Sequence, residues 1–243
     1  NILVSIMQKL KNTADGIRKN PGTHLINPSS NEIIYSPPEG EELIRNKMFA
    51  LEQFINNADD NIDPLIKMAL AHYQFEAIHP FADGNGRTGR ILNVLYLVHR
   101  QLLTMPVLYM SSFIIHNKKE YYRLLRMVTE NNDWRQWILY MLNAVATTSD
   151  MTLKKIEAIV RLKEETGIQC KKALKKSYSH ELVDLIFSFP YIKIKTLEYH
   201  NIAKRETASI YLKSLSQAGI LNSVKIGKEI YFINYRLMQL LMK

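Results

Sequence analysis

The chain has very little cysteine, no long apolar run and no initiator methionine. Its 243 residues include a single cysteine, Cys170, which excludes an internal disulfide framework and a four-cysteine zinc site and is typical of a reducing compartment. No run of 18 or more apolar residues occurs, so the sequence predicts no membrane span and no membrane partner. The start at Asn1 lacks a basic segment followed by an apolar core, so we expect no signal peptide and a cytoplasmic location.

What is present is an ordinary globular composition with an uneven charge. Hydrophobic residues make up 47% and charged residues 23%, and the length fits one large or two smaller domains. Residues 1–150 carry 15 of the 32 basic and 15 of the 23 acidic residues, so the whole net charge of +9 lies in residues 151–243. Such asymmetry indicates two units with different partners. A basic unit favours polyanions such as nucleic acid, although a solvated lysine-rich surface gives the same count.

The spacing of apolar residues predicts helices over most of the first 176 residues. The expected helices cover the first part of 2–19, and then 40–57, 65–78, 87–103, 118–130, 134–149 and 152–176. Residues 20–40 do not follow this helical spacing. Clusters of Asn, Pro, Gly and Ser flank two short runs, at 23–26 and 32–35, that are expected to be extended. This pattern indicates a β-hairpin within an otherwise helical region.

The last 64 residues have a different pattern of predicted elements. Three short helices are expected at 180–189, 195–200 and 205–217, the third ended by Gly219. Two β-type runs follow at 220–226 and 229–234, and Gly227 suits the tight turn between them. This order of three helices and a hairpin is that of a winged helix-turn-helix. We therefore expect three parts, at 1–150, at 151–179 as a helical connector, and at 180–243 as a winged-helix domain.

The densest signal for function is the segment His79-Pro80-Phe81-Ala82-Asp83-Gly84-Asn85-Gly86-Arg87-Thr88-Gly89-Arg90. It lies between two apolar helices, and its glycines permit backbone conformations that point several N–H groups in one direction. The second helix begins there with free N–H groups and the positive end of its dipole, which together favour a phosphate. The segment does not match a Walker loop, because no Gly-Lys-Ser/Thr follows the glycines.

The side chains of this segment point to phosphate transfer. Arg87 and Arg90 lie three residues apart and add two charged forks suited to phosphate. Asp83 is expected to hold a divalent metal that bridges phosphate oxygens. His79 ends the preceding helix and can take a proton from an attacking hydroxyl, while Phe81 is expected to point inward as an anchor. A glycine-rich turn with a packed histidine is the alternative, but here seven polar or glycine residues of this kind fall within twelve positions.

This segment resembles the Fic family motif, His-Pro-Phe-x-Asp/Glu-Gly-Asn-Gly-Arg-x-x-Arg, and meets every defined position. Residues 71–78, 120–122 and 133–134 are also similar to bacterial Fic proteins with a C-terminal winged helix. The resemblance implies a mainly α fold. It would consist of a Fic helical core with a β-hairpin flap at 22–38 and the motif at 79–90, followed by a small winged helix-turn-helix domain.

The resemblance implies transfer of AMP from ATP to a Tyr, Thr or Ser hydroxyl of a target protein, with release of pyrophosphate. His79 would be the base and Asp83 would bind magnesium. The α- and β-phosphates would lie against Gly84, Asn85 and Gly86. Arg87 would help to hold the phosphates and Arg90 would meet the γ-phosphate. The residues assigned to catalysis are thus His79, Asn85 and Arg87.

Two segments outside the motif are implied as well. Flap residues would hold the target segment and border the nucleotide. These residues are Glu32, Ile33, Ile34 and Tyr35. Tyr121 and Tyr122 would line the adenine side. The alternative is that both tyrosines pack in the helical core. For Tyr122 this interpretation is as good as a place beside the adenine, and for Tyr121 it is the poorer of the two.

Many family members carry an inhibitory helix with the pattern Ser/Thr-x-x-x-Glu-Gly/Asn, whose Glu pairs with the second motif Arg. Ser177 and Glu181 have this spacing, but Leu182 follows, so we interpret them as the capped entry to the winged helix. No such pattern precedes Asn12. We expect Arg90 to be unopposed if no upstream helix supplies that Glu.

In the winged-helix interpretation, residues 205–217 form the recognition helix, which would enter the major groove of DNA. The basic residues expected to contact DNA are Lys204, Arg205, Lys213, Lys225 and Lys228. A dimerisation or target-docking module is the alternative, because the helix offers few arginines, the commonest readers of bases.

Two other functions stay open at this point. One is a nucleotide-sensing, DNA-binding regulator, and the other is a Fic enzyme that removes AMP from proteins or uses another nucleotide donor. His79 argues against the sensor, because a sensor needs the phosphate cradle but no base. The target protein, the base specificity and a homodimeric state are not written in the sequence.

Overall fold

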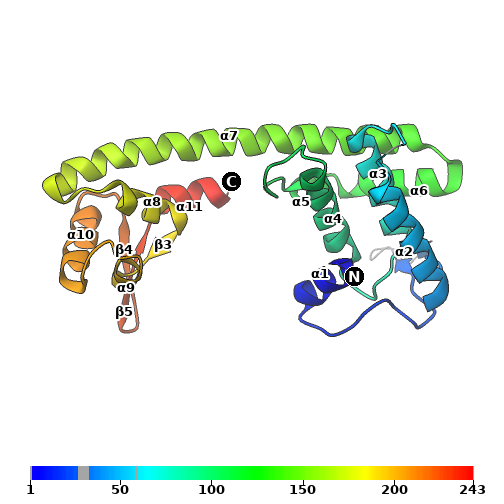
Figure 1. The fold of residues 1–243 in the computed structure, drawn as a ribbon, viewed down its shortest axis with the longest axis horizontal. Coiled ribbons are helices and arrows are strands. Elements are labelled where there is room, and N and C mark those ends of the chain that lie inside the picture. The colour runs from blue at the N-terminus through cyan, green and yellow to red at the C-terminus, as the bar shows by residue number, and fades with distance from the viewer. Residues whose placement is uncertain (1, 27–32, 59, 243) are drawn as a thin grey trace. The chain divides into compact units, whose positions relative to one another are not determined.

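The computed structural model describes residues 2–26, 33–58 and 60–242, so Glu32 of the expected flap lies outside the described residues. The chain divides into two compact units, Asn1–Thr152 and Leu153–Lys243 (Figure 1). Both are mainly helical, as the sequence predicts. Among the described residues, no helix is long and apolar enough to cross a membrane.

The first unit is a set of helices with one small hairpin. Its elements are α1 Ile2–Lys11, β1 Leu25–Ile26, β2 Ile33–Tyr35, α2 Glu41–Asn56, α3 Pro64–Ile78, α4 Asn85–His99, α5 Met110–His116, α6 Lys118–Asn131 and the first part of α7 Trp134–Leu174. β1 and β2 pair antiparallel where the hairpin is expected, with Leu25 opposite Tyr35. The short helix α5 is not foreseen, because seven residues carry too little periodicity.

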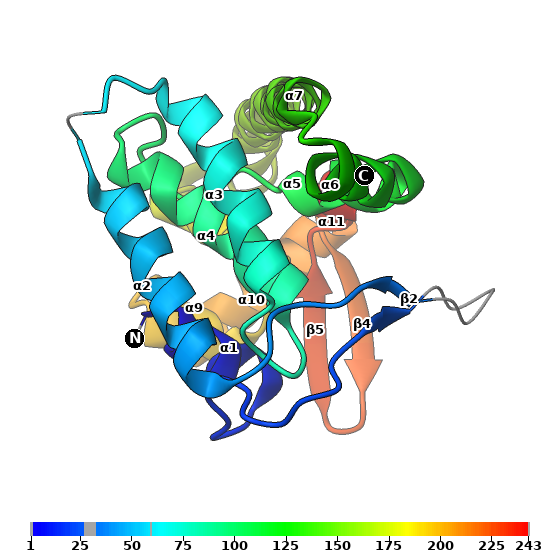
Figure 2. The same cartoon turned by 90° about the vertical axis from the view of Figure 1, so that its right-hand side faces the viewer.

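Helices α3 and α4 carry the motif loop between them, and their ends are set by local chemistry. The Asp63 carboxylate accepts hydrogen bonds from the N–H groups of Leu65 and Ile66, and Pro64 occupies the first helical position. α2 and α4 both lie next to α3 (Figure 2). The loop is therefore held by two neighbouring helices whose facing sides are buried.

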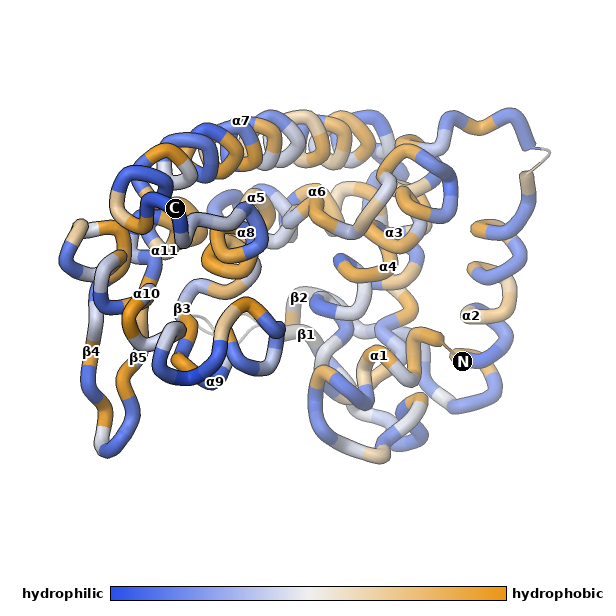
Figure 3. Tube along the Cα trace, turned by 60° about the vertical axis from the view of Figure 1, so that its left-hand side comes forward, coloured by the Kyte–Doolittle hydropathy of each residue, from blue (hydrophilic) through white to orange (hydrophobic). Residues whose placement is uncertain are grey.

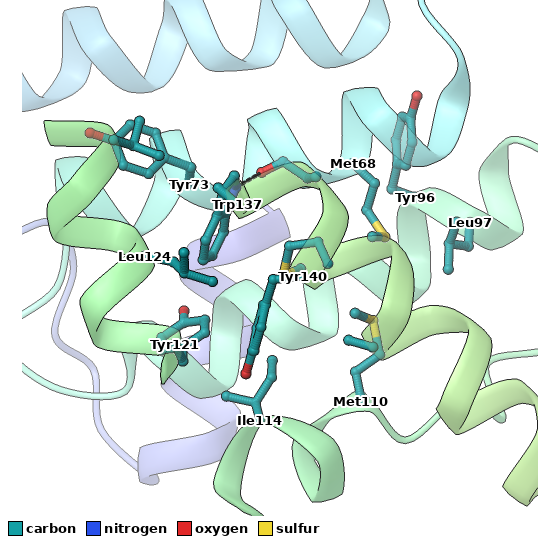
Figure 4. Packing of buried hydrophobic residues seen from close by; sticks show 14 of the residues in the cluster. Met68, Tyr73, Tyr96, Leu97, Met110, Ile114, Tyr121, Leu124, Trp137 and Tyr140 are labelled. Atoms are coloured by element: carbon teal, nitrogen blue, oxygen red, sulfur yellow. Dashed lines mark hydrogen bonds between the residues drawn. The ribbon is translucent and has the colours of Figure 1, made fainter. Parts of the chain in front are cut away.

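The core of this unit is built around Trp137, which is fully buried (Figure 4). Its indole N–H donates to the Ala69 carbonyl at 2.8 Å, so the polar end of the ring is paired. Tyr73 meets the neighbouring Trp134 edge-on with ring centroids 4.8 Å apart. This core fixes α3 against α6 and α7, and with α3 it fixes the start of the motif loop.

α7 is one helix of 41 residues, where the sequence indicated two. The prediction of a break near residues 149–152 is wrong, because that stretch contains neither Pro nor Gly and keeps its helical hydrogen bonding. Hydrophobic and hydrophilic residues alternate along its turns (Figure 3). Residues 153–174 of α7 belong to the second unit.

The second unit has the helix and strand order of a winged helix. After a short 3-10 turn at Lys175–Ser177, its elements are α8 His180–Ser188, β3 Tyr191–Ile192, α9 Ile194–Tyr199, α10 Arg205–Gln217, β4 Asn222–Ile226, β5 Glu229–Ile233 and α11 Tyr235–Met242. The strands form an antiparallel sheet in the order β3-β5-β4. β3 and α11 are additions to the predicted pattern.

Local signals again set the ends of these elements. Ser179 accepts from the Leu182 N–H and caps α8, so the cap is Ser179 and not Ser177 as expected. Gly227 takes a positive φ of 61° in the turn between β4 and β5. The buried side chains of Leu197, Leu212 and Phe232 pack into one apolar core.

Candidate active site

The motif loop begins with a strained histidine. His79 ends α3 in the left-handed conformation, with φ 49° and ψ 58°, and its N–H donates to the Phe75 carbonyl at 3.0 Å. A left-handed conformation is uncommon for a residue with a side chain and is often retained for function. The next residue, Pro80, cannot continue the helix. The chain therefore turns away from α3 at His79.

The surroundings of the His79 imidazole favour its neutral form. Burial lowers the pKa of His79 from its usual value, and a hydrogen bond with the backbone of Glu76 acts against that fall. The positive charge of Arg18 lowers the pKa of His79 further, and Asp83 raises it. Nδ1 is buried and has no hydrogen-bond partner among the described residues. A neutral imidazole can accept a proton at neutral pH, and because Nδ1 is shielded from solvent, Nε2 is the ring nitrogen that a target hydroxyl would meet.

Arg18 holds the start of the loop from outside the motif. Its backbone N–H donates to the Pro80 carbonyl at 2.9 Å, and its Nε donates to the His79 carbonyl at 2.8 Å. Nη2 donates to the carbonyls of Pro38 and Ile78. Arg18 is 6% exposed. One buried guanidinium thus ties the end of the flap segment to the end of α3.

Asn85 closes the loop on itself. Its side-chain amide donates to the Phe81 carbonyl at 2.7 Å and accepts from the Phe81 N–H at 2.9 Å. Asn85 is 2% exposed, and the Phe81 ring is buried against Phe75, as the sequence predicts for an anchor. The side chain of Asn85 is therefore engaged within the loop, and this revises its expected role: only the backbone N–H of Asn85 is left for a phosphate.

The start of α4 lies where the sequence predicts an anion site. Gly84 precedes the helix with φ 88°, a conformation that suits glycine. The first N–H groups of the helix, those of Asn85, Gly86 and Arg87, have no acceptor within the helix. Arg87 is half exposed, so its guanidinium is free to move toward a bound anion.

Asp83 lies beside this helix start, and its charge is compensated. Its Oδ1 accepts from the Gly84 N–H, and its Oδ2 is paired with Lys11 of α1 and lies 3.9 Å from Arg87 Nη2. The hydrogen bond from Lys11 is the largest reason why the pKa of Asp83 lies below its usual range. The carboxylate side chain is 63% exposed and accessible to a cation from solution.

Arg90 lies one turn into α4 and faces a buried acid. Its Nε donates to Ser111 Oγ at 2.7 Å. A side chain on Gly86 would place its Cβ 3.2 Å from Arg90 Nη1 and 4.0 Å from Glu76 Oε1, so both groups border the same space. Oε1 is buried without a hydrogen-bond partner among the described residues. Burial raises the pKa of Glu76 to about 7, and Arg90 acts against that rise.

A cavity of about 320 Å³ opens beside the end of α3. Three elements line it, the flap hairpin, α3 and α6. The lining residues are Ile33, Tyr35, Ser36, Tyr73, Glu76, Ala77, Tyr122, Leu125, Arg126, Thr129 and Glu130. Its walls are mostly apolar or aromatic with a few polar groups, which is typical of a small-molecule site.

The structure separates the two tyrosines that are both expected to line the adenine side. Tyr122 lines the cavity. Tyr121 is buried in the core, where its hydroxyl is hydrogen-bonded to His72 Nε2 at 2.9 Å, so the prediction that it lines the adenine side is wrong. The reason is helical geometry, because Tyr121 shares its side of α6 with the core residues Leu124 and Val128.

The flap is fixed to α3 by Tyr35. Its hydroxyl donates to the Ala77 carbonyl at 2.8 Å, two residues before His79. Ile33 and Tyr35 line the cavity, and Ile33 is largely exposed. Ile34 lies between them in β2. The expected flap residues that the structure describes therefore lie next to the motif.

The five basic residues expected to contact DNA lie in the second unit and are all exposed. They are Lys204, Arg205, Lys213, Lys225 and Lys228, and none has an ion-pair partner among the described residues. They belong to the start and middle of α10 and to the β4–β5 hairpin. The exposed face of α10 also carries Glu206 and the apolar Ile210, which is 62% exposed.

Sequence reasoning missed four residues of the candidate site, namely Lys11, Arg18, Glu76 and Ser111. Glu76 lies three residues before the motif, so the sequence offered a hint in its position on the helix that leads to His79. Lys11, Arg18 and Ser111 reach the motif from segments far away in the chain. The sequence around each of these three residues contains no pattern that would identify it as part of the site.

Comparison with known proteins gives one consistent picture. A sequence profile of the Fic/DOC family matches residues 3–97, and one described as the C-terminal domain of SoFic-like protein adenylyltransferases matches residues 162–237. Among curated proteins, the protein adenylyltransferase Fic of Drosophila grimshawi is 29% identical over 129 residues, which cover 50% of this chain and 25% of that protein. The protein adenylyltransferase fic-1 of Caenorhabditis elegans is 31% identical over 105 residues, 43% of this chain and 19% of that protein.

Among solved structures, a Fic family protein from Desulfovibrio desulfuricans G20 aligns with 95% of this chain and 67% of its own, with a TM-score of 0.54 and 18% identity. At that identity the likeness concerns the fold. The aligned part of the chain spans between 19% and 31% of the length of these curated relatives and others that it matches.

Proposed function

We propose that this chain is a member of the Fic/DOC family and a protein adenylyltransferase that moves AMP from ATP to a Tyr, Thr or Ser hydroxyl of a target protein. The observation that carries the proposal is the juxtaposition of two groups. One is the partly buried imidazole of His79, whose lowered pKa favours the neutral form, and the other is the start of α4, whose N–H groups have no acceptor in the helix. A base beside an anion site is what nucleotidyl transfer requires.

The triphosphate fits the start of α4. The N–H groups of Gly86 and its neighbours would donate to phosphate oxygens, and the helix dipole adds to that attraction. Arg87 is free to reach a phosphate, and Arg90 would meet the γ-phosphate from the next turn. The cavity lined by Tyr122, Leu125 and Tyr73 would take the base, since it opens beside the end of α3, where the motif loop begins.

Asp83 fits magnesium in the way magnesium is commonly bound. The described residues contain no group of three or more His, Cys, Asp or Glu that could form an all-protein metal cage. Magnesium is usually held by one or two carboxylates together with substrate phosphates and waters, and Asp83 is an exposed carboxylate beside the anion site. When bound there, the metal would neutralise phosphate charge.

The reaction needs one proton acceptor. The target hydroxyl oxygen would attack the α-phosphorus, and the bond from that phosphorus to the oxygen bridging to the β-phosphate would break. Pyrophosphate leaves with the electron pair of that bond, and the hydroxyl proton passes to the imidazole of His79. The hydrogen bond from Arg18 to the His79 carbonyl keeps this residue at the entrance of the anion site. Ile33 and Tyr35 in β2 offer an edge against which an extended target segment can lie.

Intact-protein and peptide mass spectrometry after incubation with ATP and magnesium tests the proposal. We expect a mass gain of one AMP on the chain itself or on an added lysate protein. The gain should vanish in His79→Ala and persist in His116→Ala, because His116 is exposed and lies outside the site. Loss of AMP from a modified protein would favour the reverse reaction. No transfer from any nucleotide donor, with ATP still bound, would contradict the proposal and favour a nucleotide sensor.

For the second unit we propose DNA binding, supported by its five exposed, unpaired basic residues and by the winged-helix order of its elements. Duplex DNA affinity of the whole chain should fall steeply with salt, and Lys225 and Lys228 changed together to Gln should weaken it. Salt-independent or absent binding would contradict this function and favour protein docking through the exposed Ile210. For the chain as a whole, we infer a cytoplasmic location from its single, buried cysteine.

A further inference from the structure

Helix α1 ends directly on the motif loop. A Cβ on Gly84 would lie 3.5 Å from Lys11 Cγ and 3.6 Å from Met7 Cγ, so the stem of Lys11 lies within van der Waals reach of the loop. Met7 is buried and anchors the helix at this point. The position of Lys11 is therefore set by packing as well as by charge.

The ammonium group of Lys11 occupies the oxygen that a metal would use. Asp83 Oδ1 is taken by the Gly84 N–H, and Oδ2 is hydrogen-bonded to Lys11 Nζ. Arg87 Nη2 lies 3.9 Å from the same oxygen. A divalent cation on Oδ2 would meet two positive charges within a few ångströms, and like charges at that separation repel. The ammonium therefore disfavours a divalent cation on the same oxygen.

We propose that Lys11 competes with the divalent cation for Asp83 and so sets the magnesium concentration at which the site takes up its nucleotide. This rests on the proposed function. In the resting state Lys11 covers Asp83, and in the loaded state magnesium replaces it. The Lys11 side chain is one-third exposed and has a flexible four-carbon stem, so it can move to a phosphate oxygen.

The size of the effect follows from the exposure of the pair. Ion pairs with solvent-exposed partners are worth little, and breaking one shifts a competing equilibrium by about two- to fivefold. Lys11→Met keeps the stem that packs on Gly84 and removes only the charge. Lys9→Met is the matched control, because Lys9 lies in the same last turn of α1, is exposed and has no ion pair among the described residues.

Calorimetric binding of α,β-methylene-ATP at a series of magnesium concentrations tests the competition without turnover. The nucleotide binds magnesium in solution equally in every experiment. Differences in the magnesium midpoint between variants therefore arise from the protein. We expect Lys11→Met to lower the magnesium midpoint about two- to fivefold. Lys9→Met and Lys11→Arg should leave it unchanged. In an Asp83→Asn background, Lys11→Met should have no effect.

Several outcomes would overturn the inference. One is an unchanged midpoint in Lys11→Met while the analogue binds normally, and another is an equal shift in Lys9→Met, which would indicate general electrostatics. Thermal unfolding of each variant without ligand verifies folding, and Lys11→Gln replaces Lys11→Met if the latter is unfolded. If the wild-type chain does not bind the analogue at any magnesium concentration, the proposed function is contradicted as well. If it binds the analogue but the midpoint does not depend on Lys11, only the competition is contradicted.

Discussion

The guanidinium of Arg18 donates a hydrogen bond to the backbone carbonyl of His79 at 2.8 Å, across 61 positions of the chain. The same residue holds the neighbouring Pro80 through its backbone N–H. His79 has a positive φ, which costs free energy unless its surroundings enforce it. Arg18 supplies that enforcement and is a positioning residue for the base.

Replacing Arg18 tests this role. Arg18→Ala should lower the free energy of unfolding by about 3 kcal/mol, because several backbone carbonyls lose a charged donor in a buried place. It should reduce kcat at least tenfold while the nucleotide affinity changes little, since Arg18 does not touch the start of α4. Arg18→Lys should recover part of both losses. The exposed Arg45→Ala is the control, and a loss of nucleotide affinity without a loss of kcat would contradict a positioning role.

The pH dependence of transfer should follow His79. Burial lowers the pKa of His79 from the usual 6.5, so the neutral base predominates throughout the range above pH 6.5. We expect kcat/KM to be flat as regards this group from pH 8 down to 6.5. Below the pKa of His79 it should fall about tenfold per pH unit. Rates measured in buffers of constant ionic strength would reveal this, and a midpoint above 6.5 would be inconsistent with a buried, neutral imidazole.

Glu76 should make stability depend on pH in the opposite sense from an ordinary acid. Its pKa is raised to about 7 from 4.5, so the native state favours the protonated form and loses stability as the pH rises from 4.5 to 7. Glu76→Gln keeps the shape without the charge. The variant should exceed the wild type in free energy of unfolding by about 3 kcal/mol at pH 8, and the difference should shrink toward pH 4.

Urea unfolding of both proteins at several pH values measures that difference. Gln217→Ala serves as a control for a change in polar surface, because Gln217 is exposed. A constant difference between Glu76→Gln and the wild type across the pH range would mean that the Glu76 carboxyl is ionised in the folded protein.

Gly89 should tolerate no side chain. A Cβ there would lie 2.6 Å from Glu76 Oε1 and 3.0 Å from Phe75 Cδ1, both on α3. Gly89→Ala should therefore push α3 and α4 apart and cost about 1–3 kcal/mol of unfolding free energy. Gly16→Ala is the matched control, because nothing lies within 4 Å of its Cβ position. Equal melting temperatures for the two variants would contradict the close approach of α3 and α4.

Much of the local structure follows from short-range signals in the sequence. Asp63 and Pro64 start α3, Gly84 starts α4 and Gly227 turns the β4–β5 hairpin, each through hydrogen bonds or dihedral angles within a few residues. The motif predicted a loop between two helices with a helix start that attracts anions, and Phe81 points inward as expected. Caps and turns act over a few residues, so they can be recognised without the rest of the chain.

Other features depend on which surfaces meet, and only the tertiary structure decided them. Tyr121 and Tyr122 are neighbours of the same type, yet one packs in the core and the other lines the cavity, because adjacent positions of α6 face different surroundings. Lys11 and Arg18 reach the motif from 72 and 61 positions away, through contacts that no local pattern encodes. The sequence by itself determined the loop and its chemistry, whereas packing between distant segments determined which charges hold the base and cover the carboxylate.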